Sequence, residues 1–132
     1  MPKKPSRTTQ RNKADRLFSE LIRSKGYCER CKRTDGFLQC CHIRSRRFLN
    51  TRWNEGNSFC ACAGCHRWFH DHPHLFGAWL NQKYGSDKVQ QVHELSLSTD
   101  KVDLEAVIER LTARLAEDEQ IESSGKLDEK KP

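Results

Sequence analysis

The spacing of apolar residues predicts a helix-rich protein that contains a short β segment. Apolar residues recur at helical spacing over four segments, residues 13–25, 73–84, 86–97 and 103–121. Gly26 and Gly85 stand where the first two of these helices should end, and Pro73 suits the first turn of the second. Residues 37–43 follow an Asp-Gly turn and predict a strand. The pattern therefore favours an α+β protein.

The segments between these elements suggest a domain organisation. We expect residues 1–12 to be a flexible basic arm and residues 122–132 to be a disordered charged tail. Residues 13–85 form the predicted central domain, and residues 86–121 a helical C-terminal extension. Within the central domain, residues 44–57 read as a long basic loop with a second strand near its far end. The residues after Asn57 then suit a turn that enters a short helix.

Charge is distributed unevenly along the 132 residues. Residues 1–52 carry 15 Lys and Arg against four Asp and Glu, a net charge of +11, while residues 53–85 are neutral and residues 86–132 carry −5. A basic segment of this kind releases counterions from a phosphate backbone, which gives affinity for nucleic acid of any sequence. The alternative is a solvated face that only keeps the protein soluble.

Seven cysteines stand in a sequence whose first residues lack the apolar stretch of a secretory signal, and no apolar run is long enough to span a membrane. We therefore expect a cytoplasmic protein in a reducing compartment, where metal binding is favoured over disulfides. Two C-x2-C pairs, Cys28 with Cys31 and Cys62 with Cys65, have the spacing of zinc knuckles. Four thiolates from two knuckles predict a structural Zn²⁺ site.

Histidines accompany these knuckles. His66 follows Cys65, and His70 lies four residues later, so on one helix both imidazoles project from the same face and can share a second metal ion. His42 lies at the end of the predicted strand.

The order of these residues resembles a known family. A CxxC pair, then CHIRSRR, then Asn57, then CxxCH with a further histidine four residues on, is similar to the HNH endonucleases, of the zinc-stapled small kind found in phages. The resemblance covers residues 27–74. It implies a ββα-metal (His-Me finger) core stapled by the four-cysteine zinc site, with flanking N- and C-terminal helices.

The resemblance also implies catalytic roles. His42, Asn57 and His66 match the family's three named positions: His42 would accept a proton from water, and Asn57 would hydrogen-bond across the hairpin to hold the His42 loop. His66 and His70 would hold a catalytic divalent cation, Mg²⁺, Mn²⁺, Ni²⁺ or Zn²⁺, at the phosphate. His72 is an alternative to His70.

Three further features bear on this site. Many relatives have Asp or His before the base histidine, where this chain has Cys41, which either ligates the ion or packs in the core. Cys40 and Cys60 are expected to pack. Four arginines between the base and the helix could clamp DNA phosphates, namely Arg44, Arg46, Arg47 and Arg52.

The function expected is that of a metal-dependent HNH endonuclease that nicks or cuts DNA. The resemblance suggests phage or mobile-element DNA processing such as packaging, recombination or defence, in the cytoplasm of the host cell. DNA is the expected partner, with a phage packaging or recombination complex as a further one, and the protein is expected to be a monomer or homodimer. The alternative from another class is a noncatalytic zinc-finger module that binds nucleic acid.

Overall fold

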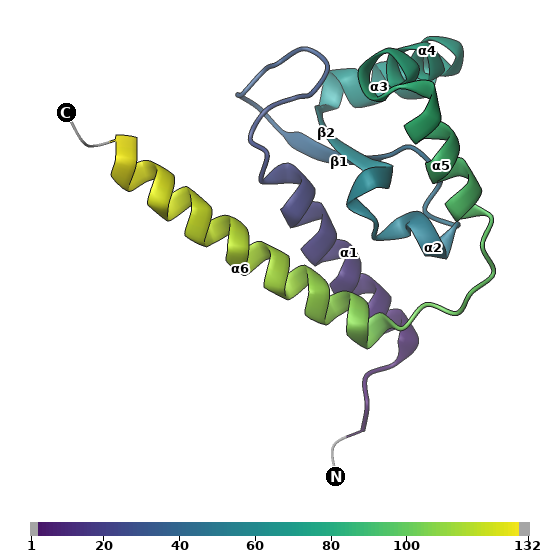
Figure 1. Ribbon diagram of the computed structural model, residues 1–132, viewed down its shortest axis with the longest axis vertical. Helices are drawn as coiled ribbons and strands as arrows, with labels where there is room; N and C mark the ends of the chain where they lie inside the picture. Colours follow the sequence, from purple (N-terminus) through teal and green to yellow (C-terminus); the bar gives the residue numbers. More distant parts are fainter. Residues whose placement is uncertain (1–2, 130–132) are drawn as a thin grey trace. The chain divides into compact units, whose positions relative to one another are not determined.

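The protein is α+β, with one two-stranded sheet among the described residues (Figure 1). The computed structural model describes the backbone of residues 3–129 and the side chains of residues 3–119. Its elements in chain order are α1 (Arg7–Arg23), β1 (Leu38–His42), α2 (Leu49–Arg52), the 3-10 turn η1 (Glu55–Asn57), β2 (Ser58–Cys62), α3 (Ala63–Asp71), α4 (Pro73–Tyr84), α5 (Ser86–Ser96) and α6 (Leu104–Glu129). No described helix combines the length and apolar character needed to cross a membrane.

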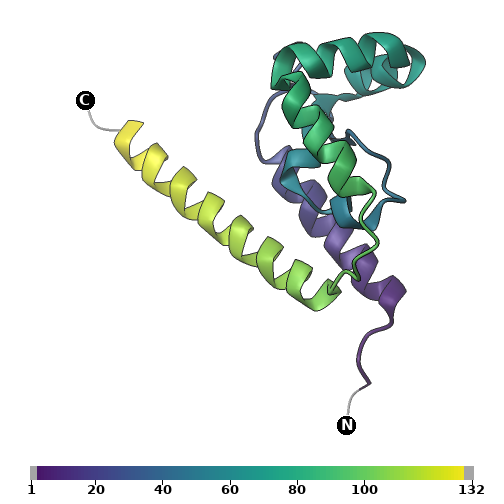
Figure 2. The same ribbon diagram turned by 45° about the vertical axis from the view of Figure 1, so that its right-hand side comes forward.

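The chain divides into two compact units. The central unit is Ile22–Val102, and the helical unit combines Met1–Leu21 with Asp103–Pro132. The boundary expected at 85/86 falls inside the central unit, because α5 packs against α2 and α4 (Figure 2). The boundary expected at 12/13 lies within α1, and the units divide after Leu21 instead. The side-chain amide of Asn50 donates hydrogen bonds to the carbonyls of Ser98 and Asp100, which attach the residues after α5 to α2.

In the central unit, an antiparallel hairpin runs directly into a helix. Strand β1 pairs with β2 in a register that sets Cys41 opposite Phe59 and His42 opposite Ser58, and α3 begins at the residue after β2 (Figure 1). Because side chains alternate along a strand, Gln39 and Cys41 share one face of β1, and Cys40 and His42 share the other. The first face is the one that α3 covers, since Cys41 and Phe69 lie in one buried cluster.

The prediction of the second strand was wrong in its position. It was expected within residues 44–57, whereas β2 is Ser58–Cys62, the stretch interpreted as a turn. Burial explains the difference, because Phe59, Cys60 and Ala61 are 1%, 0% and 0% exposed, so β2 lacks the alternation of polar and apolar residues that marks a half-buried strand.

An aromatic cluster holds the helices to the hairpin. The Phe59 ring packs edge-on against Phe69, with centroids 5.4 Å apart, and Phe69 lies 4.7 Å from Phe76 and 4.8 Å from Trp79. Each such pair contributes about 0.5–1.5 kcal/mol beyond its burial of apolar area. Helices α3 and α4, whose expected break at residues 71–73 is confirmed, are thereby fixed on one face of the sheet.

The helical unit corrects the expectations for both ends of the chain. Helix α1 begins at Arg7 rather than residue 13, because Ser6 caps it: the Ser6 Oγ accepts a hydrogen bond from the Thr9 N–H at 3.1 Å. Only residues 3–6 of the expected arm lack helix. Helix α6 continues through Glu129, so residues 122–129 of the expected tail are helical, and residues 130–132 lie outside the described residues.

Candidate metal centre and active site

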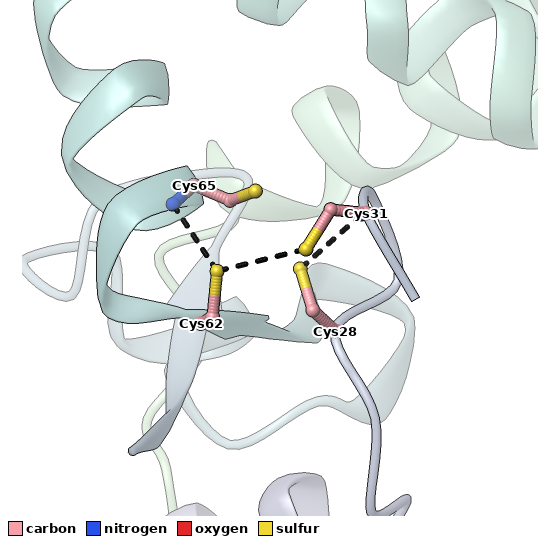
Figure 3. Close-up of side chains that lie close together, drawn as sticks. All are labelled: Cys28, Cys31, Cys62 and Cys65. Atoms are coloured by element: carbon pink, nitrogen blue, oxygen red, sulfur yellow. Dashed lines mark hydrogen bonds between the residues drawn. The ribbon is translucent and has the colours of Figure 1, made fainter. Parts of the chain in front are cut away.

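Four cysteine side chains converge in the central unit (Figure 3). The first knuckle, which follows α1, supplies Cys28 and Cys31, while Cys62 ends β2 and Cys65 lies in the first turn of α3. Their sulfur atoms all lie within 4.8 Å of one another. The convergence expected from the two C-x2-C pairs is therefore confirmed, and the cluster could hold a metal ion.

The spacing of the sulfurs suits a tetrahedral ion. Zn–S bonds of about 2.3 Å place neighbouring sulfurs of a tetrahedron about 3.8 Å apart. The Sγ atoms of Cys31 and Cys62, which come from different knuckles, are 3.8 Å apart. Three of the four cysteines are buried and Cys31 is exposed. A soft, four-sulfur donor set of this kind favours zinc over magnesium or calcium.

The surroundings shift the pKa values of two cluster cysteines in opposite directions. Burial opposes ionisation of Cys28, yet hydrogen bonds from backbone N–H groups, first that of Cys31, outweigh it and lower the pKa of the thiol to about 6. Burial raises the pKa of Cys65 to about 12, although a hydrogen bond from Arg30 acts to lower it. The Arg30 Nη1 lies 3.4 Å from the Cys65 Sγ, and its guanidinium stacks 3.6 Å from the Trp68 ring centre. A positive charge thus stands beside the sulfurs.

Sequence reasoning missed the carboxylate inside the first knuckle. Glu29 is only 5% exposed, and its two oxygens accept hydrogen bonds from the Cys60 N–H at 2.7 Å and the Lys25 Nζ at 3.0 Å. The Glu29 N–H also donates to the Cys60 carbonyl at 2.8 Å, so the knuckle extends the outer edge of β2. The available signal was an acidic residue between two ligand cysteines in an otherwise basic segment.

His42 ends β1, and a backbone carbonyl orients it. Its Nε2 lies 3.0 Å from the Arg52 carbonyl oxygen, and because a carbonyl only accepts, Nε2 carries the proton. Nδ1 is then the nitrogen that can accept one. His42 is half-buried, on the face of β1 opposite to Gln39.

Asn57 is fully buried between the ends of the loop that joins the strands. Its Oδ1 accepts from the Arg44 N–H at 2.7 Å, and its Nδ2 donates to the carbonyls of Arg44 at 3.1 Å and Thr51 at 3.0 Å. Arg44 lies two residues after His42, and Thr51 precedes the residue whose carbonyl orients it. Asn57 thus fixes the backbone on both sides of His42.

His66 and His70 lie one turn apart on α3, as their spacing requires. The His66 Nδ1 is 2.6 Å from the Gln39 Oε1 on β1. Burial, and then the nearby charge of His70, lower the pKa of His66, which favours the neutral, metal-binding imidazole. His70 is exposed.

His72, the alternative ligand to His70, does not share a face of α3 with His66. It caps the C-terminus of α3, its Nδ1 donates to the Trp68 carbonyl at 2.9 Å, and its ring stacks on Trp68 with centroids 5.1 Å apart. Six residues separate it from His66, so the two do not share a helix face. Of the two candidates, the structure sets His70 beside His66.

Cys41 packs in the core and does not complete a three-ligand group with His66 and His70. It is 2% exposed within the cluster that includes Phe59 and Phe69, and burial raises the pKa of its thiol well above the ordinary value. A thiol that stays protonated in apolar surroundings is suited to packing rather than to binding a metal ion. Cys60 is likewise fully buried and Cys40 partly buried. Across the described residues, the four-cysteine cluster is the one group of three or more potential ligands.

The four arginines surround α2, in a segment we call the arginine loop (residues 44–52). The guanidiniums of Arg44 and Arg47 lie 4.5 and 4.9 Å from the centre of the Phe48 ring, one ring holding two cations. Arg52 lies 5.2 Å from the Trp53 ring centre, and its Nη1 donates to the Arg46 carbonyl at 3.4 Å. Aromatic rings and carbonyls thus preorient a dense positive surface beside His42.

In comparisons with known proteins, no family model, no curated protein and no solved structure matches this chain.

Proposed function

We propose that the protein is a metal-dependent endonuclease that hydrolyses phosphodiester bonds of DNA. The observation that carries the proposal is the hairpin of β1 and β2 running directly into α3, with His42 at the end of β1, Asn57 at the end of η1 just before β2, and His66 on α3. This order agrees with the HNH-like spacing of the sequence. We propose that the hairpin and α3 form a ββα-metal core.

In this proposal His42 is the general base. The Arg52 carbonyl holds the proton on Nε2, so Nδ1 can take a proton from an attacking water. Asn57 keeps the backbone around His42 rigid, which preserves the position of the base. The arginine loop binds phosphates on either side of the bond to be cut.

His66 and His70 would hold the catalytic divalent cation. When bound, the ion supplies Lewis acidity toward the phosphate oxygens. Two imidazoles leave positions for water and substrate, as a catalytic metal site needs. The four-cysteine cluster would hold Zn²⁺ as a structural ion.

Cleavage of supercoiled plasmid tests this proposal. The purified protein is incubated with Mg²⁺, Mn²⁺, Ni²⁺ or Zn²⁺, or with EDTA, beside a His42→Ala variant and a His93→Ala control, whose histidine lies on α5 outside the site. We expect metal-dependent cleavage, a loss of about 10²- to 10⁴-fold in His42→Ala, and no change in the control. Zinc content is measured in each variant, because loss of zinc would itself explain loss of activity.

A second candidate is a noncatalytic zinc module that binds nucleic acid. It is favoured by the observation that His42, His66 and His70 form no three-ligand group in the described residues, whereas the four cysteines do. Binding of plasmid without cleavage under any metal, unchanged by His42→Ala, would support the module and reject the endonuclease.

A further inference from the structure

Gln39 is a polar side chain of β1 that faces helix α3. It pairs with Ala61 in the register of the sheet and lies on the same face of β1 as the buried Cys41. Its Oε1 is 2.6 Å from the Nδ1 of His66 on α3. The contact joins residues 27 positions apart across the interface of strand and helix.

This contact determines which nitrogen of His66 carries the proton. A carboxamide oxygen only accepts hydrogen bonds, so the Nδ1 of a neutral His66 must be the donor. The lone pair of the ring then lies on Nε2. An imidazole coordinates a metal through its unprotonated nitrogen, and the hydrogen bond of the other nitrogen sets which one that is.

We propose that Gln39 is a positioning residue that holds His66 with Nδ1 protonated and so makes Nε2 the metal-binding nitrogen. The proposal rests on the proposed function for the task of the bound ion. The contact also restricts rotation of the ring about its χ angles, because the short hydrogen bond ties it to a paired strand. The lone pair on Nε2 is therefore already oriented for an ion, and less conformational entropy is lost when the ion binds.

The first test measures the tautomer of His66 in protein with Gln39 unaltered. In zinc-loaded protein labelled with ¹⁵N on histidine, the chemical shifts of the two ring nitrogens report the tautomer of His66, and a His66→Gln variant assigns the signals. We expect the Nδ1-protonated form. A His66 that is predominantly protonated on Nε2 would overturn the proposal.

The second test removes the acceptor. Gln39→Met keeps a side chain of similar length without a hydrogen-bond acceptor, while Gln39→Glu retains an oxygen in its place. Gln90→Met is the control, because Gln90 is an exposed glutamine on α5. Co²⁺ or Ni²⁺ is titrated into each protein with the cysteine cluster already filled with zinc.

The expected pattern is specific. Gln39→Met should bind the added ion about 10- to 100-fold more weakly, Gln39→Glu at least as tightly as the parent protein, and Gln90→Met equally. Unchanged affinity in Gln39→Met would reject the role of Gln39. If Gln39→Met fails to fold, as judged by its zinc content, the tautomer measurement alone decides.

Failure of the proposed function is distinguishable from failure of this inference. An Nδ1-protonated His66 and the expected affinities, without plasmid cleavage under any metal, would reject the endonuclease and retain the role of Gln39. Cleavage by a protein whose His66 is protonated on Nε2 would do the reverse.

Discussion

The cysteine cluster shares the hairpin and α3 with the histidines through Cys62 and Cys65, but the two sets of side chains are arranged differently. The four sulfurs point at one another, and all lie within 4.8 Å. The histidines instead turn to protein oxygens, His42 to the Arg52 carbonyl and His66 to the Gln39 amide. One set forms a compact four-ligand group, as a structural metal site requires, whereas each of these two histidines is oriented by a hydrogen bond to the protein.

The comparison teaches that the two regions depend on different forces. An ion bound by the cysteine region would hold the four sulfurs together and join the first knuckle to the start of α3. The histidine region is held by hydrogen bonds, chiefly those of the buried Asn57. Removal of the metal should therefore destabilise mainly the cysteine region, and removal of the Asn57 hydrogen bonds mainly the histidine region.

The largest effect should follow loss of a cysteine ligand. Cys28→Ser removes a buried member of the cluster, and we expect the loss of one bound zinc and a fall of at least about 3 kcal/mol in unfolding free energy, or more than about 12 °C in Tm. Metal content by atomic emission and thermal unfolding by circular dichroism measure both.

The matched control for this variant is Cys40→Ser, whose cysteine lies outside the cluster. It should keep its zinc and lose no more than about 1 kcal/mol. Equal zinc content in Cys28→Ser and Cys40→Ser would show that the cluster does not bind the ion.

A smaller but substantial loss is expected from Asn57→Ala. The substitution leaves both backbone groups of Arg44 and the Thr51 carbonyl without their present partner, in a site that is 0% exposed. We expect a loss of about 2–4 kcal/mol, measured by urea unfolding, with zinc content unchanged.

Asn54→Ala is the matched control from the same loop. Its side chain makes one hydrogen bond, from the Gly56 N–H at 2.8 Å, and its removal should cost about 1 kcal/mol. If the two variants lost equal stability, or if Asn57→Ala also lost its zinc, the separation of the two regions would be wrong.

Much of the local structure could be predicted from the sequence because its causes are local. The helix over residues 73–84 was confirmed as α4, with Pro73 at its start and Gly85, at a φ of 86°, at its end. The convergence of the four cysteines followed from knuckle spacing alone. Within each knuckle and at each end of α4 the deciding residues lie within a few positions of one another, although the two knuckles meet across 31 positions.

The contacts that shape the site are long-range, and the sequence pattern does not contain them. Gln39 reaches His66 across 27 positions, and Glu29 reaches Cys60 across 31. Which face of β1 is covered by α3 also depends on the register of β2, and that register placed Cys41 in the core. Cysteine counts as apolar in one setting and as a ligand in another, so composition could not distinguish Cys41 and Cys60 from the metal cluster.

The smallest expected effect concerns the electrostatic interaction between His66 and His70. Burial and the charge of His70 lower the pKa of His66, so below pH 6.5 an unfolded chain binds a proton at this position that the folded protein does not. His66 therefore contributes to a loss of stability as the pH falls from 6.5 toward its folded pKa. In His70→Gln the second cause is removed while burial persists, so the pKa of His66 should rise but stay below that of an exposed histidine. An NMR titration of the His66 ring in zinc-loaded protein measures both values. An unchanged His66 pKa in His70→Gln would mean that the two rings do not interact, and the region would then offer one metal ligand rather than two.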